Sequence, residues 1–323
     1  MRLELGKIFI KDIIFDEGES RIEDHILYLN KKELADVSGV ADDEHLESID
    51  FDIAHPGEST RITPVKDVNE PRVKVEGGEI FPGILNKVDP VGSGKTIALK
   101  DIAVVTTGKI VGFQEGIIDM SGLGAEYTPF SKTVNLVVTI EPVEGVKQHN
   151  HEAGVRMAGL RITDFIGRLA KDLEADEWET FETLPILEQV KQYPELPKVV
   201  YVYMLQTQGL LHDTYVYGVD AKKIIPTFLY PTEIMDGAIC SGNCVSACDK
   251  NPTYVHLNNG VIRELYKEHG KSINFLGVVI TNENVYLMDK VRHSDMTAKL
   301  CEFLGADAAI VSQLSLIHIS EPT

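Results

Sequence analysis

Phe275-Leu276-Gly277-Val278-Val279-Ile280-Thr281 is an unbroken, mainly apolar run, and the sequence around it decides the fold. A short run that is apolar on both faces is typical of a strand buried inside a parallel sheet. The spacing of apolar residues predicts helices over residues 255–269 and 295–304, each stopped by the glycine that follows it. Residues 198–206 and 308–312 are further strand candidates. Strands that alternate with helices predict an α/β arrangement with a partly parallel sheet.

The first 140 residues show a different pattern, in which short strands alternate with turns that contain glycine and proline. The strand candidates are residues 3–14, 21–29, 61–65, 72–75, 102–106 and 134–140. Apolar residues then recur three or four apart over residues 152–173, which predicts an amphipathic helix, whereas the acidic connection 174–197 predicts no clear element. We therefore expect an α+β or α/β chain with a β-rich domain over residues 1–145 and an α/β domain over residues 146–313.

The composition excludes several classes of protein. The chain has 323 residues, with 31 Lys and Arg against 50 Asp and Glu, and its net charge is −19. Because this charge repels phosphate backbones, no nucleic acid is expected as a partner. The apolar runs are far shorter than the ~20 residues that cross a membrane, and the first residues lack the apolar centre of a signal peptide. We expect a cytoplasmic chain that binds no membrane.

The last ten residues, 314–323, differ in character from the sequence before them. They resemble translated sequencing-adapter read-through, and we interpret them as an artefactual tail. We therefore expect the natural chain to continue beyond Gln313, and the α/β domain to be incomplete at its C-terminus.

Gly92-Ser93-Gly94-Lys95-Thr96 resembles part of a phosphate-binding loop. Such a loop needs a further glycine where this chain has Asp89, whose carboxylate repels phosphate. We reject ATP binding and expect a polar hairpin turn. A second weak signal is His149 and His151, which share one face of an extended segment and could bind a divalent metal. No third ligand is evident, and the polar start of a helix explains the same residues.

Three of the four cysteines, Cys240, Cys244 and Cys248, lie within nine residues. Their spacing does not match the pairs that bind zinc or the common iron–sulfur runs, and Cys301 is distant. A module that binds metal or an iron–sulfur cluster through these cysteines stays an alternative. A second alternative is that these cysteines are ordinary thiols buried in the core.

Backbone chemistry at Asn243–Cys244 is the third interpretation. Gly242 permits unusual backbone dihedrals, so the Asn243 carbonyl could be presented to the Cys244 thiol. Attack of the thiolate would convert the peptide bond to a thioester. Elimination would then release the upstream chain and leave dehydroalanine, which hydrolyses to a pyruvoyl group at the new N-terminus. The residues alone leave the three interpretations open.

Several long segments resemble the precursor of glycine/sarcosine/betaine reductase component B, and most closely its glycine reductase proprotein. The segments are residues 111–120, 127–132, 201–206, 209–218, 230–233, 236–239 and 241–249, and the similarity runs through Gln313. The resemblance implies an oxidoreductase subunit that cleaves itself between Asn243 and Cys244, with Cys244 becoming a covalent pyruvoyl cofactor. It therefore favours the third interpretation.

The resemblance also implies a reaction and partners. Glycine would form a Schiff base with the pyruvoyl carbonyl and be reduced to acetyl phosphate and ammonia. The partners would be the selenoprotein subunit of component B, selenocysteine protein A and the acetyl-phosphate-forming protein C. Sarcosine, betaine and D-proline reductase precursors are alternatives, although betaine has no N–H with which to form a Schiff base. Polar residues that could bind the substrate carboxylate or act as the general acid are Arg61, Lys109, Arg156 and His212.

Overall fold

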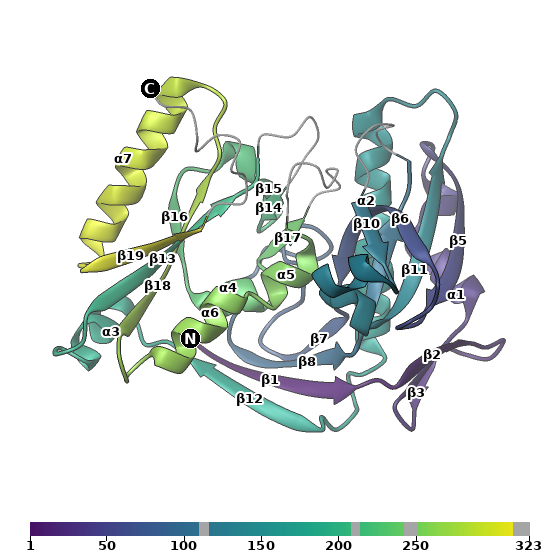
Figure 1. Ribbon diagram of the computed structural model, residues 1–323, viewed down its shortest axis with the longest axis horizontal. Coiled ribbons are helices and arrows are strands. Elements are labelled where there is room, and N and C mark those ends of the chain that lie inside the picture. The colour runs from purple at the N-terminus through teal and green to yellow at the C-terminus, as the bar shows by residue number, and fades with distance from the viewer. Residues whose placement is uncertain (110–115, 208–213, 242–250, 313–323) are drawn as a thin grey trace.

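The computed structural model describes residues 1–109, 116–207, 214–241 and 251–312 (Figure 1). One four-stranded sheet has the order β16 (Thr227–Leu229), β18 (Asn274–Asn282), β13 (Lys198–Leu205) and β19 (Ala308–Ser312). Strand β13 is parallel to both β18 and β19, whereas β16 is antiparallel to β18. All nine residues of β18 are buried, as its apolar sequence predicts. The partly parallel sheet and its three predicted strands are confirmed.

Helices flank this sheet, and both predicted helices differ from their expected bounds. Helix α7 (Leu287–Phe303) connects β18 to β19 and begins eight residues before the predicted start at residue 295. The helix predicted over residues 255–269 is instead two helices, α5 (Thr253–Leu257) and α6 (Gly260–Glu268). The break has a local cause, because the Asn259 side chain accepts a hydrogen bond from the Ile262 amide at 3.0 Å and caps α6.

The first half of the chain is rich in strands, as predicted. These strands, joined by β12 from the later connection 174–197, form three sheets with the orders β12-β1-β8-β7, β10-β6-β9-β11-β5 and β2-β4-β3. We call these the first-half sheets. Their strands are β1 (Arg2–Phe9), β2 (Asp12–Phe15), β3 (Arg21–Glu23), β4 (Ile26–Leu29), β5 (Leu46–Ala54), β6 (Arg61–Asn69), β7 (Arg72–Glu76), β8 (Gly94–Lys100), β9 (Ile102–Thr107), β10 (Gly116–Asp119), β11 (Val134–Pro142) and β12 (Glu177–Glu182). A smaller sheet joins β15 (Val219–Asp220), β14 (Thr214–Val216) and β17 (Ile239–Ser241). The mixed α+β fold agrees with the expectation.

Helix α2 (Gln148–Arg168) is the predicted amphipathic helix, and it packs against β7 and β9 of the first-half sheets. The acidic connection 174–197 contains β12 and α3 (Ile186–Gln192). Strand β12 pairs antiparallel with β1, and both extend along the bottom of Figure 1 between the α7 side and the α2 side. The division near residue 145 stays a prediction. The remaining short elements are α1 (Lys31–Ser38), α4 (Pro231–Met235), η1 (Val40–Asp42), η2 (Leu123–Tyr127), η3 (Pro129–Lys132) and η4 (Ala221–Lys223).

A buried ion pair connects strand β7 of the first-half sheets to the residue that follows helix α4. Lys74 of β7 donates to Asp236 after α4 at 2.6 Å, and both side chains are fully buried. Asp236 also accepts hydrogen bonds from the Thr96 hydroxyl at 2.6 Å and the Gly92 amide at 2.7 Å. The stretch Gly92–Thr96 therefore contacts a carboxylate, and its residues Gly94–Thr96 begin strand β8. The hairpin turn expected from the sequence is wrong for these three residues, because they pair with β1. A Cβ on Gly94 would lie 2.3 Å from the Glu76 carbonyl, so close backbone approach explains this glycine.

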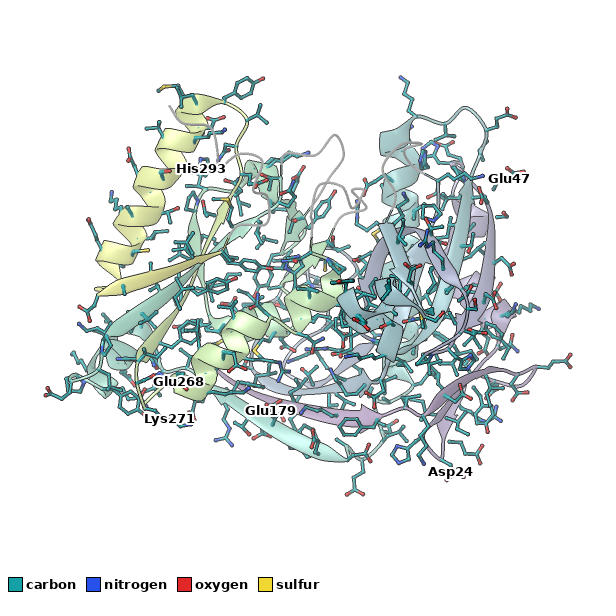
Figure 2. The ribbon with its side chains drawn as sticks, in the orientation of Figure 1. Asp24, Glu47, Glu179, Glu268, Lys271 and His293 are labelled. Carbon is teal, nitrogen blue, oxygen red and sulfur yellow. The ribbon has the colours of Figure 1, made fainter. Side chains whose placement is uncertain are left out.

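Exposed charge is spread around the molecule. Asp24, Glu47 and the neighbouring residues Glu268 and Lys271 lie at three separate places on its periphery in Figure 2. Within the described residues, no helix combines the length and the apolar composition that crossing a membrane requires.

Candidate functional site

The segment that the sequence analysis singles out lies outside the described residues. Segment 242–250 contains Gly242, Asn243, Cys244 and Cys248. Both flanks of the segment are described, because strand β17 ends at Ser241 and the chain continues from Asn251. The contacts of these two flanks define the surroundings of the candidate site.

One carboxylate joins the two flanks through a chain of hydrogen bonds. The Ser241 amide donates to the Thr253 hydroxyl at 2.9 Å, and that hydroxyl donates to Asp67 Oδ2 at 2.7 Å. The Thr253 amide donates to Asp67 Oδ1 at 2.9 Å. Asp67, Thr253 and Ser241 are all buried, and we call them the flank bridge. Asp67 belongs to β6, so a first-half sheet holds the two ends of segment 242–250 together.

A second buried network binds the downstream flank. The Asn251 amide group donates to the Tyr203 hydroxyl at 3.0 Å, and this hydroxyl lies 2.8 Å from His256 Nδ1. Tyr203 also stacks on Tyr201, with ring centres 5.3 Å apart. Burial raises the pKa of Tyr203 above its usual value, and the neighbouring Tyr201 adds to this effect. Tyr203 is therefore a neutral phenol, and its hydroxyl connects Asn251 of the downstream flank to His256.

Cys240 is a core thiol. It is 2% exposed and belongs to a core with Ile80, Phe81, Leu160 and Leu257. Burial raises the pKa of the Cys240 thiol well above its usual value, and the charge of Asp67 acts in the same direction. A neutral, buried thiol is a poor metal ligand and a poor nucleophile. The buried-thiol interpretation therefore fits Cys240.

A charged pair on helix α2 lies beside strand β14, which pairs with strand β17 that contains Cys240. Arg156 and Glu152 form an ion pair one helical turn apart, with 10% and 0% of their side chains exposed. The Arg156 guanidinium lies 4.5 Å from the ring centre of Tyr215, which is the strand partner of Cys240. His149 and His151 lie in the first turn of helix α2, so the extended segment assumed for a metal site is wrong and the helix start is confirmed. Burial lowers the pKa of His151, although Glu152 opposes the effect. Arg156 thus places a buried positive charge near the upstream flank.

The other predicted candidates lie elsewhere. Arg61 pairs with Asp119 between β6 and β10, with Nε and Oδ1 2.6 Å apart and the arginine exposed. Lys109 is exposed after β9, while His212 and the side chain of His149 lie outside the described residues. Among the residues that the structure describes, no group of three His, Cys, Asp or Glu is arranged to hold a metal ion. Sequence reasoning missed Asp67, Thr253, Tyr203 and His256, because their contacts join positions far apart in the chain.

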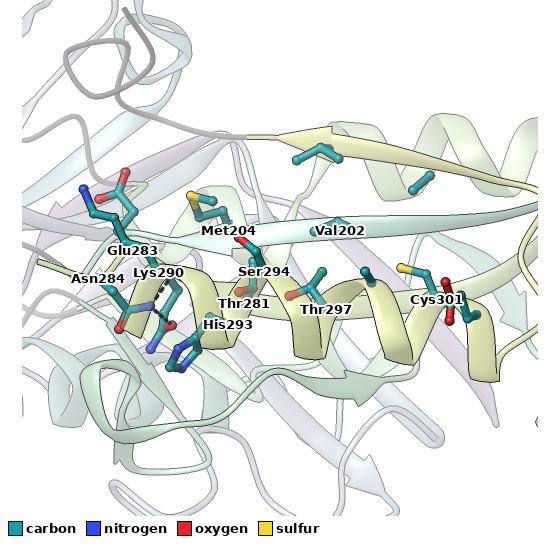
Figure 3. A pocket seen from close by; sticks show the side chains of 15 residues that line it. Val202, Met204, Thr281, Glu283, Asn284, Lys290, His293, Ser294, Thr297 and Cys301 are labelled. Atoms are coloured by element: carbon teal, nitrogen blue, oxygen red, sulfur yellow. Dashed lines mark hydrogen bonds between the residues drawn. The ribbon is translucent and has the colours of Figure 1, made fainter. Parts of the chain in front are cut away.

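A groove of about 590 Å³ lies between α7 and the parallel sheet. Figure 3 shows Val202 and Met204 of β13 facing Thr297 and Cys301 of α7 across it. Because side chains alternate along a strand, Tyr201 and Tyr203 face away from this groove and into the core on the other side, where Tyr203 contacts His256. The groove is therefore on the opposite face of the sheet from the flanks.

Comparison with known proteins assigns the chain to a family. The sequence model of the family "Glycine/sarcosine/betaine reductase component B subunits" matches residues 1–315. The chain belongs to this family. No solved structure matches the chain.

Three curated relatives are similar over nearly the whole chain. The glycine reductase complex component B subunits alpha and beta of Acetoanaerobium sticklandii are 66% identical over 97% of this chain and 72% of that protein. The sarcosine reductase complex component B subunit alpha of Peptoclostridium acidaminophilum is 60% identical over 97% of this chain and 73% of that protein. The betaine reductase complex component B subunit alpha of the same organism is 39% identical over 97% and 72%.

Proposed function

We propose that this chain is the precursor of the pyruvoyl-containing, substrate-binding component of a glycine reductase, and that it cleaves itself between Asn243 and Cys244. Membership of the component B family carries the proposal, and 66% identity to a relative named for glycine reductase favours glycine as the substrate. The Asn243-Cys244 sequence and its flanks support the position of cleavage.

The cleavage chemistry follows from the two residues. The Cys244 thiolate attacks the Asn243 carbonyl carbon, and the C–N bond breaks as the C–S bond forms. Loss of the Cys244 α-proton then breaks its Cβ–S bond, so the sulfur leaves on Asn243 as a thiocarboxylate and dehydroalanine remains. Dehydroalanine tautomerises to an imine, which water hydrolyses to the pyruvoyl group and ammonia. Water also hydrolyses the thiocarboxylate and releases hydrogen sulfide. This series of reactions consumes water and needs no oxidant.

The surroundings of the flanks fit this chemistry and the group it creates. Asp67 and the Tyr203–His256 pair are buried polar groups whose hydrogen bonds hold the two flanks of segment 242–250. Arg156, which is 10% exposed at its side chain and forms an ion pair with Glu152, is the proposed binder of the substrate carboxylate. A pyruvoyl group supplies an electrophilic carbonyl for the substrate amine, which no standard side chain offers. The proposed partners are a selenoprotein subunit of component B, selenocysteine protein A and the acetyl-phosphate-forming protein C.

A denaturing mass spectrum of the purified chain tests the proposal. We expect two fragments that meet between Asn243 and Cys244, the second with a ketone in place of its α-amine and without the cysteine sulfur. The variant Cys244→Ala has no thiol and should stay intact, whereas Cys240→Ala removes a core thiol and should still be cleaved. The carbonyl is confirmed by its reaction with a hydrazine reagent.

Two outcomes would contradict the proposal. One is a chain that stays intact both alone and when extended by the part of the 66% identical relative that lies outside the match. The other is cleavage that persists in Cys244→Ala. Substrate is tested separately with the partner components, because glycine would release ammonia, sarcosine would release methylamine and D-proline would open its ring.

Sarcosine is the second candidate substrate, because the sarcosine reductase relative is 60% identical to this chain. Methylamine release at a rate above that of ammonia release would favour it over glycine.

A further inference from the structure

We infer that Asp67 and Thr253 are positioning residues that set the geometry of the Asn243–Cys244 bond. The inference rests on the proposed self-cleavage and adds two residues from outside segment 242–250 to it. Asp67 and Thr253 are 186 positions apart in the chain, yet each carboxylate oxygen of Asp67 accepts one hydrogen bond from Thr253.

Hydrogen bonds hold the three residues of the flank bridge in fixed positions. Thr253 is fully buried, and its hydroxyl both donates to Asp67 and accepts from the Ser241 amide. Asp67 is fixed in turn, because its carboxylate accepts from the Val68 amide at 2.9 Å and from Asn69 Nδ2 at 3.1 Å. A hydrogen bond to a carboxylate is stronger than one between neutral groups. The bridge therefore fixes Ser241 relative to Thr253.

Fixing these two ends matters for the reaction between them. The thiol and the carbonyl belong to adjacent residues, and their reaction needs a backbone conformation that a free chain visits rarely. Joining the ends of a short loop reduces the number of conformations that it can adopt. A displacement of about 1 Å at a reacting centre can cost about 100-fold in rate. The flank bridge thus favours the reactive conformation and takes no part in bond making.

The position of Asp67 in the sheet supports this role. It lies in β6 next to an irregularity in the pairing of β6 with β9, between Val65 and Asp67. Such irregularities redirect a side chain and are frequent beside active sites. Here the side chain reaches away from its own sheet to the start of α5, and so connects a first-half sheet to both flanks.

A matched set of threonine variants tests the inference. Thr253→Val keeps the shape of the side chain and removes the bridging hydroxyl, whereas Thr253→Ser keeps the hydroxyl. Thr96→Val is the control, because the Thr96 hydroxyl is also fully buried and also donates to a carboxylate, that of Asp236, at 2.6 Å. Each full-length chain is made by cell-free synthesis, and the cleaved fraction is followed over time by denaturing mass spectrometry.

We expect Thr253→Val to slow cleavage by about 10- to 100-fold, with Thr253→Ser close to the wild type and Thr96→Val destabilised but cleaved at the wild-type rate. Rescue by serine separates a positioning role from loss of folding, and Asp67→Asn should slow cleavage as Thr253→Val does. Equal rates in Thr253→Val and the wild type, or equal slowing in Thr253→Val and Thr96→Val, would overturn the inference. A wild-type chain that is never cleaved, either alone or with the extension described above, would instead refute the proposed function, and the positioning role with it.

Discussion

At the scale of single residues, Glu70 shows how neighbouring charges control a buried acid. Burial alone would raise the pKa of Glu70, but the charges of Lys100 and Arg72 overcome this effect and hold the pKa at about 2. Arg72 Nε donates to the carboxylate at 2.8 Å, and Lys100 forms a second ion pair with it. Arg72 also donates to the carbonyls of Met235 and Leu257, so the cluster joins the first-half sheets to α4 and α5.

The free energy of unfolding should therefore depend on the ionisation of Glu70 at acidic pH. The pKa of Glu70 is lower in the folded chain than its usual 4.5. Its contribution is thus fully present above about pH 4.5 and is lost as the pH falls toward about 2. The difference between these pKa values corresponds to about 3 kcal/mol. Urea unfolding of the wild type and Glu70→Gln should show a gap of about that size at pH 7 that shrinks as the pH falls below 4.5. A gap that stays constant with pH would contradict this assignment.

At the scale of elements, strand β18 contains a bulge that only glycine accommodates. The pairing of β13 with β18 shifts between Val199 and Val200, so that Val200 is opposite Gly277. Gly277 has φ +146°, and a Cβ there would lie 2.4 Å from the ring of Phe228. The ring belongs to the neighbouring strand β16, so two strands constrain this one position.

We expect Gly277→Ala to lower the free energy of unfolding by about 1–3 kcal/mol, because the methyl group clashes with the ring and the backbone is strained. The control is Gly260→Ala at the first residue of α6, where a Cβ meets no atom within 4 Å. Alanine favours helix, so this variant should be neutral or gain up to about 1 kcal/mol. Urea unfolding followed by circular dichroism measures both, and equal stability of the two variants would disprove the role of the bulge.

The same elements show what the sequence could predict. Strand β18 was predictable from its unbroken apolar run, and helix α2 from apolar residues that recur three or four apart. Strand β12 was not, because its residues alternate weakly and its partner β1 lies 170 positions away. The helix break at Asn259 results from a capping hydrogen bond, and the apolar pattern of residues 255–269 gave no indication of it. The flank bridge depends on tertiary contacts, so a single sequence contained no signal for Asp67.

At the scale of the whole molecule, the proposed cleavage point divides one fold between two chains. Strands β18 and β19 belong to the downstream part, and both pair with β13 of the upstream part, which lies between them. Strand β18 also pairs with β16, again from the upstream part. One hydrophobic core contains residues of both parts. Its downstream members include Ile262, Leu265, Phe275, Val278 and Ile280, and its upstream members include Leu3, Leu5, Tyr201 and Tyr203. Within the described residues, the downstream part therefore has no complete sheet of its own, whereas the upstream part keeps the first-half sheets and their core but lacks two strands of the sheet that contains β13.

We expect residues 1–243 and 244–323, expressed together as separate chains, to assemble into one complex with one copy of each. Buried apolar contacts and strand pairing hold this complex, so high salt should leave it intact and urea should separate it. Native size-exclusion chromatography and mass spectrometry measure the assembly. The control is a pair of chains divided between Val278 and Val279, inside the buried strand β18, which should not assemble. Parts 1–243 and 244–323 that elute separately as folded proteins would show that the two products are independent units, and that the shared sheet does not bind them together.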